Sequence, residues 1–95
     1  MYAVIRRYEQ ADALGKAMLE HEQEINDLIS SVPGFVAYYA VNEDGVLATV
    51  TVCQDKTGTD ESTRRAAEWV RTNLAGTTIA PPDVTAGSVF LTAPR

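Results

Sequence analysis

A turn signal in the middle of the chain constrains the fold most strongly. Asn42-Glu43-Asp44-Gly45 separates two runs of β-branched, aromatic and small apolar residues. An Asp-Gly pair between such runs is among the strongest short-range signals for a β-hairpin. The pattern therefore predicts strands over Phe35–Val41 and Val46–Gln54, joined by a tight turn.

The residues before this hairpin predict a strand and then a helix. Tyr2–Tyr8 is short, rich in apolar residues and followed by polar ones, which is typical of a strand. Beyond Asp12, a plausible helix cap, apolar residues recur with the three- and four-residue spacing of one helix face, up to Pro33-Gly34. We therefore expect one amphipathic helix whose inward stripe consists of Leu14, Met18, His21, Ile25, Leu28 and Val32.

The residues after the hairpin repeat this order of helix and strand. Thr57 followed by Asp60 resembles a capping box and predicts a helix of about Gly58–Leu74, which Gly76 would end. Its inner arc would carry Thr63, Ala66, Trp69, Val70, Asn73 and Leu74. A last strand is expected over Val84–Thr92.

The predicted order β, α, β, β, α, β is that of a split βαβ, or ferredoxin-like, α+β fold. Right-handed crossovers put both helices on one face of a four-stranded antiparallel sheet. With 95 residues we expect one domain covering 1–95. Its other sheet face would be bare and carry apolar and Thr side chains, and a small core gains from pairing, so we expect a homodimer.

Charge and composition exclude several classes of protein. Thirteen acids against eight bases give a net charge of −5, which opposes binding to DNA or RNA. An apolar run long enough to cross a bilayer is missing, as is an export signal, so we expect a cytoplasmic protein without a membrane role. Cys53 is the sole cysteine, which excludes an internal disulfide. We expect neither a metal site nor a cofactor.

At this point the residues resemble a known superfamily. The layout of the chain is similar to that of the dimeric α/β barrel proteins. The features that carry this similarity are an acidic helix leading into Val32-Pro33-Gly34-Phe35, the Asp44-Gly45 hairpin and the closing Pro82-Asp83-Val84 strand. The nearest match is their antibiotic-biosynthesis-monooxygenase-like branch of small bacterial proteins. The resemblance implies that two subunits join their bare sheet faces into a barrel, and that each keeps a pocket between sheet and helices.

The resemblance does not carry over a reaction. The stretch 60–70 is similar to an uncharacterised subgroup of these proteins. Haem-degrading members use an Asn on the first strand together with a Trp and a His, and only Trp69 matches that set here. The resemblance therefore argues against haem degradation.

Three residues on the two helices could carry chemistry. His21 is the only histidine and the best general acid or base, because imidazole titrates near neutral pH; the alternative is a packed histidine with one hydrogen-bond partner. Trp69 could wall a pocket or simply anchor the core. Asn73 could serve a pocket or cap its helix.

The strands offer further candidates in pairs that must face opposite ways. One of Tyr38 and Tyr39 should face the helices and the other the partner subunit. Arg6 and Arg7 also diverge, and an inward arginine would need a carboxylate or an anionic ligand, the alternative being a salt bridge at the rim. Cys53 could act as a nucleophile only with His21 beside it.

Two hypotheses for function remain open. The first is a non-catalytic dimer that binds a small apolar or aromatic molecule between the helices and the sheet, or binds another protein. The second is a cofactor-independent monooxygenase or isomerase acting on a small aromatic or carbonyl compound. Both predict the same site, lined by His21, Trp69, Asn73 and a helix-facing tyrosine, Tyr38 or Tyr39.

Overall fold

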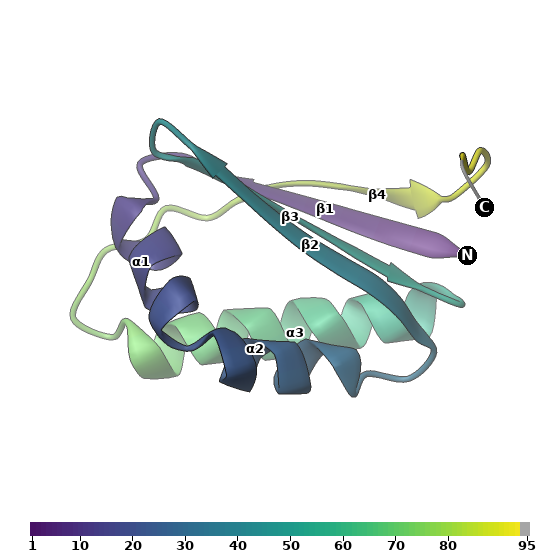
Figure 1. The fold of residues 1–95 in the computed structure, drawn as a ribbon, viewed down its shortest axis with the longest axis horizontal. Helices are drawn as coiled ribbons and strands as arrows, with labels where there is room; N and C mark the ends of the chain where they lie inside the picture. Colours follow the sequence, from purple (N-terminus) through teal and green to yellow (C-terminus); the bar gives the residue numbers. More distant parts are fainter. Residues whose placement is uncertain (94–95) are drawn as a thin grey trace.

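A computed structural model describes residues 1–93 of the chain and has four strands and three helices (Figure 1). In chain order the elements are β1 (Tyr2–Tyr8), α1 (Asp12–Glu20), α2 (Glu22–Ser30), β2 (Phe35–Glu43), β3 (Val46–Cys53), α3 (Lys56–Asn73) and β4 (Asp83–Ser88).

The strands form one antiparallel sheet in the order β2-β3-β1-β4. All three helices lie on the same face of this sheet, and its other face carries no helix (Figure 1). The predicted ferredoxin-like fold is therefore confirmed. The first predicted helix, however, is two helices in the structure, α1 and α2.

The hairpin between β2 and β3 turns where the sequence predicted. Asp44 and Gly45 have φ of 52° and 79°, the left-handed values that both central residues of a type I′ turn require. The Gly45 carbonyl also accepts a hydrogen bond of 2.8 Å from the Ala11 N–H, directly before α1. The turn thus fixes both the strand register and the start of the first helix.

The first predicted helix is broken at His21. The backbone of His21 has φ −120° and ψ 30°, outside the helical region, so the expected helix to Val32 becomes α1 and α2. The break lets α1 cover the hairpin end of the sheet while α2 runs beside α3 (Figure 1). A periodic stripe could not reveal it, because the inward residues of both halves still fit one spacing.

The start of α3 also differs from the prediction. The N-cap is Asp55, whose carboxylate Oδ1 accepts a hydrogen bond of 3.1 Å from the Thr57 N–H. Thr57 lies inside the helix, and Asp60 pairs instead with Lys56 Nζ at 2.8 Å. The predicted capping box of Thr57 and Asp60 is therefore wrong, since an acidic cap two residues earlier satisfies the first turn.

This cap can be tested directly. Asp55→Ala should lower the free energy of unfolding by about 1 kcal/mol, because it leaves an N–H of the first helical turn without its acceptor. Thr57→Ala is the matched control and should cost less, since only the backbone of Thr57 takes part in the cap. Urea melts monitored by circular dichroism measure both. The reverse ranking would restore Thr57 as the cap.

The last strand is shorter than predicted. β4 ends at Ser88, not Thr92, because Ser88 pairs with Tyr2, the first residue of β1, and the ladder stops there. Phe90 and Leu91 follow with 95% and 77% of their surface exposed. The apolar residues that predicted a longer strand are present, but β1 has no residue left for them to pair with.

The two faces of the sheet differ in composition. On β3 the residues Leu47, Thr49, Thr51 and Cys53 are buried beneath the helices, and the valines and the alanine that alternate with them face the other way. On β3, the helix-free side is therefore the wholly apolar one. We call the helix-free face of the sheet the open face; its central residues are Ile5, Tyr39, Val41, Val46, Ala48, Val50 and Val52.

Candidate functional site

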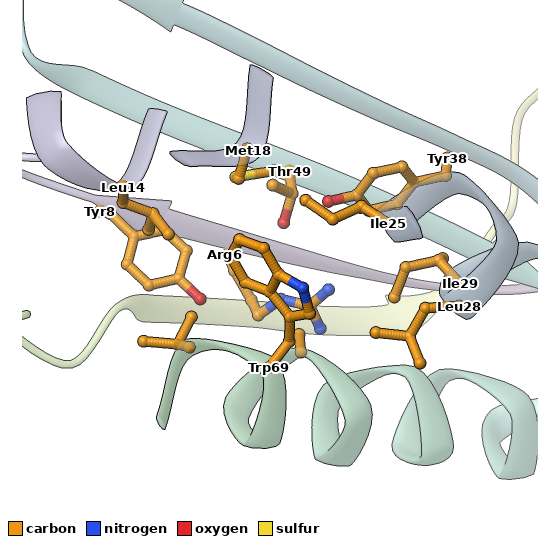
Figure 2. Close-up of a pocket in the computed structure, with 12 residues that line it drawn as sticks. Arg6, Tyr8, Leu14, Met18, Ile25, Leu28, Ile29, Tyr38, Thr49 and Trp69 are labelled. Atoms are coloured by element: carbon orange, nitrogen blue, oxygen red, sulfur yellow. The ribbon is translucent and has the colours of Figure 1, made fainter. Parts of the chain in front are cut away.

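A small cavity of about 30 Å³ lies between the sheet and the helices. Figure 2 shows polar atoms from β1, β2 and β3 turning into it under the Trp69 ring of α3. Its polar side chains are Arg6, Tyr8, Tyr38, Thr49 and Trp69. Apolar side chains make up the rest of its wall, among them Leu14, Met18, Ile25, Leu28, Ile29, Ala66 and Val70.

Arg6 is the most unusual residue of this cavity. It lies in the middle of β1 on the helix-facing side and is only 2% exposed. Its guanidinium donates to Thr63 Oγ1 at 2.8 Å and to Thr51 Oγ1 at 3.3 Å, both uncharged acceptors. Within residues 1–93 no carboxylate lies within 4 Å of it. The salt bridge considered for an arginine on this strand is made by Arg7, on the open face, with Glu9.

Two phenols face this guanidinium. Burial raises the pKa of Tyr8 and of Tyr38 above their ordinary value, and the positive charge of Arg6 offsets part of the rise for each. Both side chains are therefore protonated at neutral pH. Each phenol can donate a hydrogen bond to an oxygen placed between them.

Thr49 adds a polar atom without a partner. It pairs with Arg6 in the sheet and is 3% exposed. Of the side-chain nitrogens and oxygens buried in residues 1–93, only Thr49 Oγ1 has no hydrogen-bond partner. Such an atom costs free energy unless something enters the cavity to bond it.

A wider groove of about 370 Å³ lies next to this cavity. Met18, Ile25 and Tyr38 line both spaces, so the groove and the cavity adjoin at these side chains. Its outer wall is mostly apolar, with three exceptions: Glu22, Asn26 and Asn42. Groove and cavity together have the form of a small-molecule site, apolar along its length and polar at its inner end.

Trp69 is held in place at the edge of the cavity by two residues of the first helical region. Its indole N–H donates to Glu24 Oε2 at 3.2 Å, and Glu24 Oε1 lies 3.1 Å from His21 Nδ1. The His21 ring stands edge-on to the indole, with ring centroids 5.6 Å apart. His21 thus contacts the outer side of Trp69. Its side chain is 42% exposed and does not line the cavity, in contrast to the inward position predicted for it.

The structure separates the other predicted site residues. Tyr38 faces the helices and the cavity, whereas Tyr39 is 64% exposed on the open face, so the predicted divergence of the pair is confirmed. Asn73 is exposed and donates to the Trp69 carbonyl at 3.0 Å, outside both spaces. Cys53 is fully buried away from the cavity, and burial raises the pKa of its thiol, which disfavours the nucleophilic thiolate.

Sequence reasoning placed Tyr38 and Trp69 near the site but missed Tyr8 and Thr49. Strand parity contained the signal, since Arg6 and Tyr8 alternate with Arg7 and follow buried Val4 at two-residue steps. Only the sheet register places Thr49 beside Arg6. The importance of Arg6 could not be decided from sequence, because its partners come from β3 and α3.

Comparisons with known proteins point to one fold. No protein-family model matches the chain, and no curated protein sequence matches it significantly. Among solved structures, NE2512, a protein of unknown function from Nitrosomonas europaea, is 18% identical, with a TM-score of 0.69 over 97% of this chain and 94% of that one. SnoaB, a cofactor-independent oxygenase from Streptomyces nogalater, is 17% identical, with a TM-score of 0.65 over 99% and 97%.

A putative antibiotic biosynthesis monooxygenase from Nitrosomonas europaea is also similar, with 11% identity and a TM-score of 0.70 over 93% of this chain and 88% of that one. The chain has the fold of the antibiotic-biosynthesis-monooxygenase-like proteins. This confirms the resemblance seen in the sequence, at the level of fold.

Two further classes of feature are absent from the described residues. In residues 1–93 no three side chains among His, Cys, Asp and Glu come together where they could hold a metal ion. Across the same residues, none of the helices is long and apolar enough to cross a membrane.

Proposed function

We propose that the protein binds a small, largely apolar or aromatic molecule in the groove and cavity between its helices and sheet. The observation that carries this proposal is the junction of an apolar groove with an inner cavity that holds Arg6 and an unpartnered Thr49 hydroxyl. The groove supplies apolar area for a ring, and the cavity supplies donors for one oxygen-bearing group. SnoaB, with the same fold, is a cofactor-independent oxygenase, which is compatible with a small organic ligand.

Filling the groove tests the proposal. Ala40 lines it from β2, so Ala40→Phe should occupy space that a ligand needs. Ala67 is exposed on α3 and outside both spaces, which makes Ala67→Phe the matched control. In calorimetric titrations with 1-naphthamide we expect the wild type and Ala67→Phe to bind alike, and Ala40→Phe to bind at least tenfold more weakly. Equal affinity of all three, or binding of neither 1-naphthamide nor 1-naphthoate by the wild type, would contradict this site.

A second candidate function is a cofactor-independent monooxygenase or isomerase. It is favoured by the convergence of Arg6, Tyr8 and Tyr38, because these donors would stabilise negative charge on the oxygen of a bound carbonyl compound. The residues that line the cavity include no carboxylate, imidazole or thiol to accept a proton. Glu22 is an acid that lines the groove, and His21 lines neither space. Binding without turnover is therefore the better supported proposal.

The homodimer is part of the proposal. The open face is apolar through its centre, and Phe90 and Leu91 lie exposed just beyond β4. A single copy would leave a large apolar patch in water, and such patches are usually interfaces. Light scattering should give about twice the chain mass of 10.3 kDa. We place this dimer in the bacterial cytoplasm, where its lone thiol, Cys53, would stay reduced.

A further inference from the structure

We propose that the ligand carries a carboxylate, which the Arg6 guanidinium binds at the inner end of the cavity. This inference rests on the proposed function and names the chemical class of its ligand. It starts from a cation in the interior of the protein whose two side-chain partners, Thr63 and Thr51, are both neutral.

Burying a guanidinium without a carboxylate partner costs free energy, and the fold nevertheless buries the Arg6 guanidinium in this way. Arg6 is 2% exposed and lines the cavity of about 30 Å³ that adjoins the groove. The planar fork of an arginine matches the two oxygens of a carboxylate. A carboxylate in the cavity would thus supply the counter-charge that residues 1–93 do not place beside Arg6.

The neighbours of Arg6 fit the same group. Tyr8 and Tyr38 carry phenolic protons that can be donated to an anionic oxygen, and Thr49 Oγ1 offers a further hydroxyl. Figure 2 shows these hydroxyls turned toward the space around Arg6. Together these side chains donate hydrogen bonds to an anionic oxygen, and none of them is itself an anion that would compete for Arg6.

The charge of the surroundings favours a monoanion over a phosphate. Among residues 1–93, Arg6 is the only cationic side chain that lines the cavity or the groove, and Glu22 lines the groove. The protein as a whole carries a net charge of −5. A phosphate dianion would meet one cation and repulsion on its way in, whereas an aromatic carboxylate needs only one cation and an apolar groove.

A pair of matched compounds tests the inference. 1-Naphthoate and 1-naphthamide share an apolar body and differ in charge. In calorimetric titrations we expect the wild type to bind the carboxylate at least tenfold more tightly than the amide. Arg6→Met should remove this preference while binding the amide within about threefold of the wild type. Arg7→Met, on the open face, should keep the preference, since Arg7 faces away from the cavity.

The outcomes separate the inference from the proposed function. If the wild type binds both compounds equally, or if Arg6→Met keeps the preference, the carboxylate inference is wrong and the small-molecule site stands. If the wild type binds neither compound, the proposed function fails and the inference fails with it.

A measurement on the wild type guards against misfolding of Arg6→Met. In nitrogen-15 spectra of the arginine side chains, 1-naphthoate should shift the Arg6 Nε–H signal and leave that of Arg7 in place. A shift of Arg7 alone, or the same Arg6 shift with 1-naphthamide, would overturn the inference.

Discussion

Replacing Gly58 by alanine is expected to lower the free energy of unfolding by about 3 kcal/mol, because the added methyl group has no room. Gly58 lies in the first turn of α3 and is buried. A Cβ there would overlap the Pro33 carbonyl oxygen and stand 2.8 Å from Cys53 Cβ. Pro33 O belongs to the backbone, so no rotamer change can relieve the contact.

This close approach explains how the helices are seated on the sheet. The loop at Pro33-Gly34, the end of β3 and the start of α3 meet at Gly58, and the Gln54 N–H donates to the Gly34 carbonyl at 2.7 Å. A methyl group would push α3 away from the sheet and so disturb Trp69 farther along the helix. The site therefore depends on a glycine far from it.

Gly76→Ala is the matched control for Gly58→Ala. A Cβ at Gly76 would meet nothing within 4 Å, so we expect a change below about 0.5 kcal/mol. Chemical denaturation of both variants measures the difference. A Gly58→Ala protein as stable as the wild type would show that α3 packs less closely than the structure has it.

The second large effect is expected at the centre of the open face. Val50 lies between Ile5 on β1 and Tyr39 on β2, so in the proposed dimer Val50→Asp would bury a charge without a partner. We expect the dissociation constant of the dimer to rise at least about 100-fold, or about 3 kcal/mol. Light scattering over a dilution series measures this shift.

Leu19→Asp provides the control for Val50→Asp. Leu19 is an exposed aliphatic residue of α1, on the opposite side of the sheet from Val50, and gains the same charge. It should leave the dimer intact. Circular dichroism checks that both variants keep their helices. A Val50→Asp protein that still dimerises as the wild type does would remove the open face as the interface.

Local signals in the sequence predicted most of the fold. The Asp44-Gly45 turn needs only its own backbone conformation, and Tyr2–Tyr8 is a strand with the predicted ends. The predictions are wrong where contacts with distant parts of the chain determine where an element begins or ends. The break at His21 depends on where α1 and α2 must pack, and the end of β4 depends on where β1 begins.

The candidate site was predictable in part for the same reason. Tyr38 and Trp69 follow from strand parity and helix periodicity, which are local. Asn73 has the right helical phase, but it lies at the end of α3 and bonds its own helix. Arg6 becomes a site residue only when the sheet register brings Thr49 beside it and Thr51 within hydrogen-bond distance, and when α3 brings Thr63 over it. Such convergence is a property of the fold and not of any segment.

A crystal structure of the protein grown with 1-naphthoate tests the central claim most directly. We predict that the naphthalene ring occupies the groove between the first two helices and β2, next to Met18 and Tyr38. We predict its carboxylate within hydrogen-bond distance of the Arg6 guanidinium. Naphthoate bound on the open face or elsewhere on the surface, with groove and cavity empty, would contradict the account.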